Sequence, residues 1–201
     1  LTVLRTKAFE QFMEQNGLYE VALADLPDER IAHAFIQADL PATLVGDLRA
    51  LMARVRTPLA VRSSSMLEDA LQHPFAGVYT TKMTPNDQTS PDERFRKLQE
   101  AIKYVYASTF FGAARSYRRA TGLESESEKM AVIVQEVVGR RSGRWFLPAF
   151  AGVAFSRNEF RWSPRIRRED GIVRLVPGLG TRAVDRTSSD YPVLSVPGQP
   201  G

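Results

Sequence analysis

The amino-acid sequence predicts an α+β fold. Short apolar runs of strand length occur at residues 1–4, 59–61, 130–138 and 150–156. Between several of these runs lie longer stretches in which apolar residues recur at helical spacing. The predicted strands follow one another at both hairpin and crossover spacings. That mixture indicates helices packed with a sheet rather than an all-β protein.

Composition limits the class of protein. Of the 201 residues, 43% are hydrophobic and 25% are charged, which is enough apolar material for a sizeable core. The absence of cysteine excludes disulfides and cysteine-bound zinc. No apolar run reaches the length of a membrane span, and residues 1–10 do not resemble a signal peptide. We therefore expect a cytoplasmic protein with no membrane partner.

The chain is basic, and its arginines are clustered. The formal net charge is +4 and the sequence pI is about 9.6. Arginine clusters occur within residues 115–119, 140–144 and 161–168. Acidic residues are interleaved with most of them, and no aromatic-basic RNA-binding motif is present. We therefore rank a solvated arginine-rich surface first, binding of nucleotide phosphates second and nucleic acid last.

The N-terminal part of the sequence predicts a helical scaffold. Thr6 is a candidate N-cap of a first helix, which Gly17 would end. Residues 28–38 predict a second helix, and Pro41 stands near the start of a third. His33 has no neighbour at metal-binding spacing, so we expect it at the surface. We find no chemistry in these helices.

The stretch from residue 59 to residue 82 carries the first candidate site. A predicted buried strand, Leu59–Val61, ends in Arg62. Polar residues follow, and a glycine precedes a second β-rich run at 78–81: Ser63, Ser64, Ser65, Glu68, Asp69 and Gly77. A guanidinium can bind two phosphate oxygens at once, and hydroxyls and loop amides can supply further donors, so this pattern resembles a phosphate cradle. The alternative is an ordinary strand followed by a serine-rich turn.

The second half predicts a long helix followed by strands. Pro91 suits the first turn of a helical pattern that continues to a stop near Gly122. The strand predicted at 130–138 ends in four candidate binding residues, Gln135, Glu136, Val137 and Val138. Backbone groups at such a position can read the edge of an adenine ring. An edge strand that emerges into solvent explains the same pattern equally well.

The C-terminal part predicts turns and a hairpin. Residues 139–143 form a predicted basic turn, and 161–163 are expected to pair with 171–176 around a second basic turn. The segment PGLGTRAVDR at 177–186 has glycines that would let the backbone approach a phosphate closely. A structural turn explains a lone Gly-x-Gly better.

Taken in order, five segments resemble the N-terminal nucleotide-binding domain of phosphoenolpyruvate synthase and pyruvate phosphate dikinase. They are AVRSSSMLEDALQHPFAGVYTT, AIKYVYASTFFGAARSYRRATG, MAVIVQEVV, AGVAFSRNEF and GLGTRAVD. The N-terminal VLRTKAFEQFMEQNGL is similar to the same family, so the resemblance covers nearly the whole chain. It implies an ATP-grasp-like fold that holds ATP and magnesium between two α+β parts. It also implies phosphorylation of a histidine on a separate domain, from which a third domain passes the phosphoryl group to pyruvate or another acceptor.

The resemblance also assigns roles by position. Arg62 would bind the ATP phosphates and stabilise charge on the transferring group, as the catalytic residue of this chain. The loop from Ser63 to Gly77 would cover the phosphates, with Glu68 and Asp69 ordering it rather than binding metal. The strand end at 135–138 would hold the adenine. The implied partners are ATP and the phosphohistidine and phosphoenolpyruvate/pyruvate-type domains of the parent chain.

The resemblance places two parts of the family's site outside this sequence. A glycine-rich loop with a phosphate-contacting lysine would precede Leu1, and the magnesium ligands would follow Gly201. We therefore expect one incomplete domain, with a strand and helical scaffold at 1–58 and the ATP-grasp-like core at 59–201. We expect the chain alone to be inactive and to hold no metal ligand.

Two other interpretations remain open. The first is a non-catalytic regulatory or interaction module derived from the same fold. The second is a serine hydrolase built on Ser63–Ser65 and His73, which ranks last because no G-x-S-x-G elbow surrounds the serines.

Overall fold

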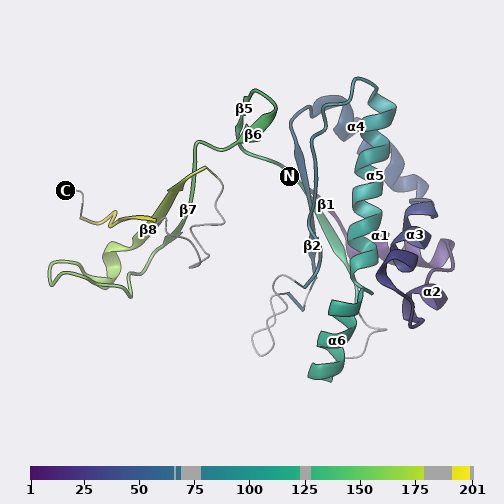
Figure 1. The fold of residues 1–201 in the computed structure, drawn as a ribbon, viewed down its shortest axis with the longest axis horizontal. Coiled ribbons are helices and arrows are strands. Elements are labelled where there is room, and N and C mark those ends of the chain that lie inside the picture. Colours follow the sequence, from purple (N-terminus) through teal and green to yellow (C-terminus); the bar gives the residue numbers. More distant parts are fainter. Residues whose placement is uncertain (66, 69–77, 123–127, 179–191, 200–201) are drawn as a thin grey trace. The chain divides into compact units, whose positions relative to one another are not determined.

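The computed structural model describes residues 1–65, 67–68, 78–122, 128–178 and 192–199 (Figure 1). The chain forms two compact units, Leu1–Val137 and Val138–Gly201. The predicted boundary after residue 58 lies inside the first of these units and remains a prediction about domain organisation.

The first unit contains a four-stranded sheet and six α-helices among its described residues. Its elements are β1 (Thr2–Leu4), α1 (Thr6–Gln15), α2 (Tyr19–Leu23), α3 (Asp28–Gln37), α4 (Ala42–Arg54), β2 (Leu59–Ser64), β3 (Lys82–Thr84), α5 (Pro91–Ser108), α6 (Gly112–Thr121) and β4 (Ala131–Glu136). The strand order is β1-β4-β2-β3, and every neighbouring pair is antiparallel. The α+β prediction is confirmed.

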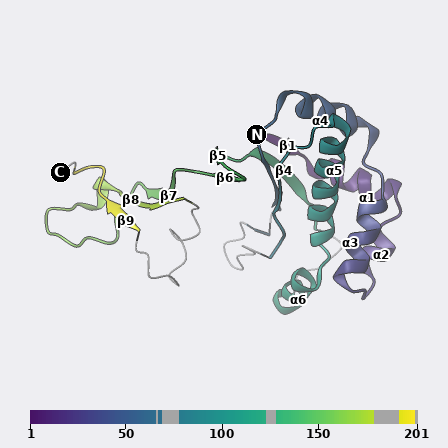
Figure 2. The same cartoon turned by 45° about the horizontal axis from the view of Figure 1, so that its top comes forward.

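The helices cover one face of this sheet, as Figures 1 and 2 show. The side chains that point to the helices are fully buried: Leu59 and Val61 from β2, and Val132 and Val134 from β4. They alternate along each strand with residues on the other face, as the pleat of a β-strand requires. The sheet therefore has one face in the core and one face away from the helices.

Aromatic side chains fill the space between the helices. Phe9, Phe12, Phe35, Tyr106 and Phe110 are all buried, and the rings of Phe9 and Tyr106 meet edge to face with centroids 5.1 Å apart. Aromatic pairs in this arrangement add to the free energy gained from burial.

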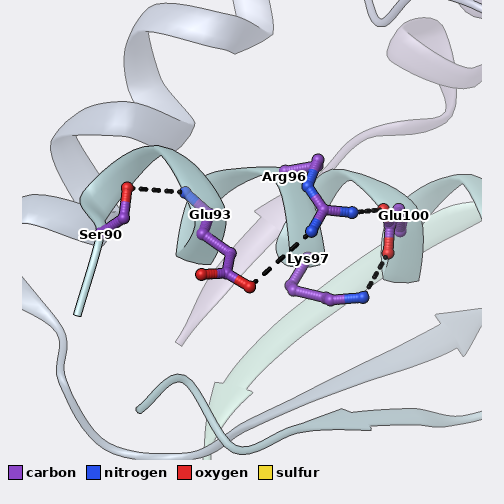
Figure 3. Close-up of polar contacts among 5 residues, drawn as sticks. All are labelled: Ser90, Glu93, Arg96, Lys97 and Glu100. Atoms are coloured by element: carbon purple, nitrogen blue, oxygen red, sulfur yellow. Dashed lines mark hydrogen bonds and ion pairs between the residues drawn. The ribbon is translucent and has the colours of Figure 1, made fainter. Parts of the chain in front are cut away.

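The longest helix, α5, is stabilised at its start and along its surface (Figure 3). The Ser90 hydroxyl accepts a hydrogen bond from the backbone N–H of Glu93, which satisfies one of the free donors of the first turn. Arg96 pairs with Glu93 and Glu100 on the exposed face, and Lys97 pairs with Glu100 at 3.1 Å. Such exposed pairs each contribute a few tenths of a kcal/mol, about 0.3–0.5.

Several predicted boundaries in the first unit are wrong. Thr6 is not an N-cap, because the capping position is Arg5, whose side chain makes no capping hydrogen bond. The helical pattern that begins at Pro91 is broken at 109–111, where α5 ends and α6 begins. The β-rich run at 78–81 is not a strand, and β3 begins only at Lys82.

The second unit is built from short antiparallel strands. Its elements are β5 (Arg140–Ser142), β6 (Trp145–Leu147), β7 (Phe150–Phe155), the 3-10 turn η1 (Arg168–Asp170), β8 (Ile172–Pro177) and β9 (Val193–Ser195). β5 pairs with β6, and the other strands form a sheet in the order β7-β8-β9.

Two predictions for this second unit are wrong. Residues 140–142 of the expected basic turn form a strand, β5, whose backbone groups bond to β6. Residues 161–163 do not form a strand. Their predicted partner, the segment 171–176, lies largely in β8, and β8 pairs with β7 instead.

No helix in the described ranges combines the length and apolarity that crossing a membrane would require.

A buried arginine joins three parts of the first unit. Arg94 on α5 is only 1% exposed, and its Nη1 donates to the carbonyl oxygens of Met52 and Val55 and to Oδ1 of Asn86. Asn86 Nδ2 in turn donates to the carbonyl oxygens of Val55 and Thr57. These bonds satisfy carbonyls at the C-terminal end of α4, which the helix itself leaves without partners.

Replacing Arg94 with methionine should therefore destabilise the first unit. We expect Arg94→Met to lower its free energy of unfolding by about 2–3 kcal/mol, because buried carbonyls lose their donors. In the described residues all α-helices lie in the first unit, while Trp145 and Trp162 lie in the second. Urea unfolding followed by far-ultraviolet circular dichroism therefore reports on the first unit, and tryptophan fluorescence reports on the second. Arg96→Met, on the exposed face of the same helix, is the matched control and should lower the free energy of unfolding by less than about 1 kcal/mol. Equal losses of stability in the two variants would contradict this role for Arg94.

Candidate functional site

The open face of the four-stranded sheet carries Arg62. Along β2, Leu59 and Val61 point to the helices, so Ala60 and Arg62 point to the opposite face. Arg62 is exposed and lies opposite Ile133 of β4, which in turn lies opposite Val3 of β1. These side chains therefore form one row across three strands.

Gln135 lies in the next row of the same face. It stands opposite Ala60, and Ala60 stands opposite Met83 of β3. Arg62 and Gln135 are thus diagonal neighbours on adjacent strands, a placement that separates such residues by about 7–8 Å. Met83 is 62% exposed, and Val3 in the row of Arg62 is 53% exposed. The two polar side chains therefore stand on a largely apolar, accessible surface.

The serines after Arg62 divide between two environments. The Ser63 hydroxyl donates to Oε1 of Glu68 at 2.9 Å, and the Ser65 backbone N–H donates to Oε2 of Glu68 at 3.0 Å. The Ser65 hydroxyl accepts from the N–H of Leu67. Ser64 lies on the same face as Arg62, opposite Ala131. Two of the donors predicted for phosphate are therefore already bonded to Glu68, and these contacts fit the ordering role expected of that residue.

Several predicted site residues lie outside the described part of the chain. Asp69, His73 and Gly77 are among them, as are residues 179–186 of the glycine-containing turn. His33 is exposed on α3, as predicted.

The end of β4 presents backbone groups at an edge of the sheet. The N–H of Val137 donates to the carbonyl of Pro58 at 2.8 Å. Because the bonds of an antiparallel strand alternate between its two neighbours, the N–H and C=O of Glu136 point away from β2. On that side the paired residues of β1 reach only as far as Val134, and no described strand residue lies opposite Glu136.

The side chains at this strand end differ in their surroundings. The Glu136 carboxylate accepts from the Thr57 hydroxyl at 2.6 Å. Val137 is partly buried, whereas Val138 is 80% exposed and begins the second unit. β4 as a whole is an interior strand between β1 and β2, so the interpretation of an edge strand is wrong except at these last residues.

A buried polar cluster behind the open face was not predicted from the sequence. The Tyr79 hydroxyl donates to Oε1 of Glu128 at 3.2 Å, and Tyr79 and Ser65 are both buried. Arg118 of α6 is 1% exposed, and its three side-chain nitrogens have no hydrogen-bond partner in the described ranges. The one available signal was helical spacing, because Arg118 follows the buried Ala114 by one turn.

Burial governs the titration of this cluster. It raises the pKa of the Glu128 carboxyl, while hydrogen bonds from Ser65 and Tyr79 and the positive charge of Arg118 lower that pKa in part. Burial and the Glu128 charge also raise the pKa of the Tyr79 hydroxyl. Both effects are those expected when an acid is taken out of water.

Charge is distributed unevenly between the two units. Residues 1–137 contain slightly more acidic than basic side chains, so the basic excess of the chain belongs to residues 138–201. In this second unit Arg168 Nε donates to Glu159 at 2.7 Å, and Arg144 lies over the ring of Trp145. Most of its arginines are exposed.

The described residues do not form a metal centre. They contain no group of three or more His, Asp or Glu side chains placed to hold an ion.

The open face of the sheet combines an accessible arginine with apolar neighbours, and the end of β4 offers backbone hydrogen-bonding groups. These features suit a nucleotide-binding domain. The chain belongs to the family described as pyruvate phosphate dikinase, AMP/ATP-binding domain, whose model matches residues 2–200. The resemblance seen in the sequence is thereby confirmed.

Three relatives share this domain. The chain is 28% identical to a phosphoenolpyruvate synthase of Aeropyrum pernix over 225 aligned positions, which cover 96% of the chain. It is 29% identical to the phosphotransferase YvkC of Bacillus subtilis over 78% of its length, and 30% identical to a rifampicin phosphotransferase of Streptomyces sviceus over 66%. The matches span 17%, 25% and 16% of the YvkC, synthase and rifampicin enzyme chains, so all three relatives are much longer.

The raised pKa of Glu128 predicts how stability changes with pH. Between the ordinary carboxyl pKa and the higher folded value, the folded protein binds more protons than the unfolded chain. Stability should therefore fall as pH rises through that window. Glu128→Gln should flatten this part of the pH profile, measured by thermal unfolding from pH 4 to pH 8, roughly the range in which carboxyl groups titrate. Asp87→Asn, at an exposed carboxyl, is the control; an unchanged profile in Glu128→Gln would contradict the assignment.

Proposed function

We propose that this chain is the ATP-binding part of a phosphotransferase that uses Mg-ATP to phosphorylate a histidine on a separate domain. The observation that carries the proposal is the placement of Arg62 and Gln135 as diagonal neighbours on one accessible sheet face. Membership of the AMP/ATP-binding family and the names of the three relatives support it.

Arg62 is the proposed catalytic residue. Its guanidinium stands at the exposed face of β2, where it can bind phosphate oxygens in a bidentate fashion and stabilise charge on the transferring group. Ser64 lies on the same face, two residues away, and can add a hydroxyl donor. We assign Ser63 and Ser65 a supporting part, since Glu68 engages donors from both.

The adenine is proposed to lie at the end of β4. Glu136 offers a backbone N–H and C=O that point away from β2, which suits the donor and acceptor edge of the ring. Gln135 offers a side-chain amide on the open face, and Val137 and Val138 offer apolar contacts. Asp69 and Gly77 remain proposed members of the phosphate loop on the family resemblance alone.

The remaining parts of the reaction are proposed for the longer parent protein. When bound, magnesium would supply positive charge that offsets the negative charge of the transferring phosphoryl group. We propose that its ligands, the phosphorylated histidine and the domain that binds the final acceptor belong to other parts of the parent. One relative is named for phosphoenolpyruvate and another for rifampicin, and this difference supports the proposal that the acceptor is bound outside the domain they share with this chain.

Replacing Arg62 tests the proposed chemistry. In the longer protein, Arg62→Ala should lower the rate of ATP-dependent histidine phosphorylation by on the order of 100-fold or more, because the transferring group loses its counter-charge. Arg62→Lys should keep part of the rate, since it retains the charge but not the fork of donors. The measurement is transfer of the labelled terminal phosphoryl group of ATP in a single turnover.

Arg54→Ala, at an exposed arginine near the end of α4, is the matched control and should leave the rate unchanged. A near-normal rate in Arg62→Ala would show that β2 is only scaffold. ATP binding without any transfer in the wild-type parent would instead favour the non-catalytic module.

Nucleotide affinity should differ between the chain and the longer protein. Isothermal titration with Mg-ATP should give clear binding to the longer protein and weak binding to residues 1–201, because the family resemblance places a phosphate-contacting lysine and the metal ligands elsewhere. Gln135→Leu should weaken binding of ATP and of AMP alike, since both carry the adenine. Tight binding by residues 1–201 would contradict the divided site, and no binding by the longer protein would overturn the ATP assignment.

A further inference from the structure

A cavity of about 380 Å³ lies in the first unit between β3 and α5. β3 and the following Pro85 line one side, and residues of α5 from Lys97 to Tyr104 line the other. Ile36 of α3 completes the lining. A cavity of this volume, with apolar residues and a few polar groups, is typical of sites that bind small organic molecules.

The cavity is separate from the residues proposed to bind ATP. Lys82 and Thr84 of β3 stand opposite Val61 and Leu59 of β2, whose side chains point to the helices. Residues directly opposite each other on paired strands share a face of the sheet, so Lys82 and Thr84 also point to the helices. Arg62 points to the open face, away from this lining.

One face of α5 provides much of the lining. Lys97, Glu100, Ala101 and Tyr104 follow one another at intervals of three or one residues, which places them on the same side of the helix. The Glu100 carboxylate is paired with Lys97 at 3.1 Å and with Arg96 (Figure 3). The negative charge in the lining is therefore already matched by two cations.

Lys82 is a positioned cation. Its Nζ lies 3.7 Å from the centroid of the Tyr104 ring, an attractive cation–π arrangement. The Tyr104 ring in turn meets Phe111 edge to face, with centroids 5.4 Å apart. No carboxylate in the described part of the chain forms an ion pair with Lys82. Its partly buried ammonium thus remains available to an anion.

The backbone of Met83 adds a donor next to Lys82. Because the N–H of Val137 bonds to Pro58, the alternation of antiparallel bonds directs the backbone groups of Ala60 toward β4. Met83 stands opposite Ala60, so its own N–H points away from β2. β3 is the last strand of this sheet among the described residues, and Met83 lines the cavity.

We propose that this cavity binds a small carboxylate that carries an aromatic or other apolar body. The Lys82 ammonium and the Met83 N–H bind the carboxylate, since charge-assisted hydrogen bonds are the stronger ones. Ile36, Ala101 and Tyr104 contact the apolar body. The Nζ of Lys103 donates to the carbonyl of Ile36 at 3.1 Å, which links α3 to α5 beside the cavity. This binding site does not depend on the proposed phosphotransfer.

Benzoate is the probe for this site, and benzamide is its neutral counterpart of similar shape. The longer protein, labelled with carbon-13 in its methionine methyl groups, is titrated with each compound and followed by nuclear magnetic resonance. The Met83 signal is the one lost in Met83→Leu. Benzoate should shift it saturably, whereas the buried Met13, Met52 and Met130 should stay unchanged. Benzamide should bind on the order of 10-fold more weakly, because it offers no charge to Lys82.

Variants locate the bound carboxylate. Lys82→Met should weaken benzoate binding by on the order of 10-fold or more, and Lys82→Arg should retain most of the affinity because it keeps the charge. Lys7→Met, at an exposed lysine of α1, is the matched control and should change nothing. Ala101→Leu should block the cavity without altering any charge. If that variant does not fold, the comparison of Lys82→Met with Lys82→Arg carries the test.

Arg62→Ala distinguishes this cavity from the proposed ATP site. Benzoate should shift the Met83 signal equally in Arg62→Ala and in the wild type, with or without ATP present. A Met83 signal that does not respond to benzoate overturns the proposal, as does equal affinity for benzoate and benzamide. A response that disappears in Arg62→Ala places the anion on the open face and also overturns it. Failure to bind ATP would refute the proposed function and leave the benzoate result standing.

Discussion

The antiparallel pairing of β2 with β4 is the constraint on which the other features of the first unit depend. It places Arg62 beside Ile133 and Ala60 beside Gln135. A shift of one residue would move every side chain of one strand to the opposite face, exposing core valines and burying Arg62. The register is therefore held by burial of Leu59, Val61, Val132 and Val134 against the helices, and the same register determines which polar groups face outward.

Much of this arrangement could be predicted from single segments. Apolar periodicity placed the helices and the strands at 59–61 and 130–138, and the charge of Arg62 after a buried run indicated an accessible position. The extension of β2 through Ser63 and Ser64 could not be predicted, because it depends on pairing with Val132 and Ala131 far along the chain. Serine has little strand preference of its own, so the tertiary partner decides.

The serine cluster shows a second limit of the sequence. A hydroxyl or backbone N–H can donate to a phosphate or to a carboxylate of the protein, and the residue types are the same in both cases. Glu68 lies close enough in sequence to be considered, but only the conformation of the turn shows that it takes the donors of Ser63 and Ser65. For Arg118, helical spacing indicates burial, whereas its relation to Glu128 depends on how α6 packs. In the second unit, β8 pairs with β7 across a long connection. This pairing could not be predicted, because strand propensity does not specify which strand will be the partner.

Two arginines illustrate how the first unit separates binding from support. Arg62 is exposed on the open face, where water solvates it until a ligand with negative charge replaces that water. Arg118 on α6 is buried, so the fold rather than water must accommodate its charge. An accessible cation can attract phosphate only if the backbone that carries it is held still, because a mobile guanidinium loses its advantage in orientation. The hydrogen bonds from the Ser63 hydroxyl and the Ser65 backbone N–H to Glu68 help to hold this strand end, and they do so without using the side chains on the open face.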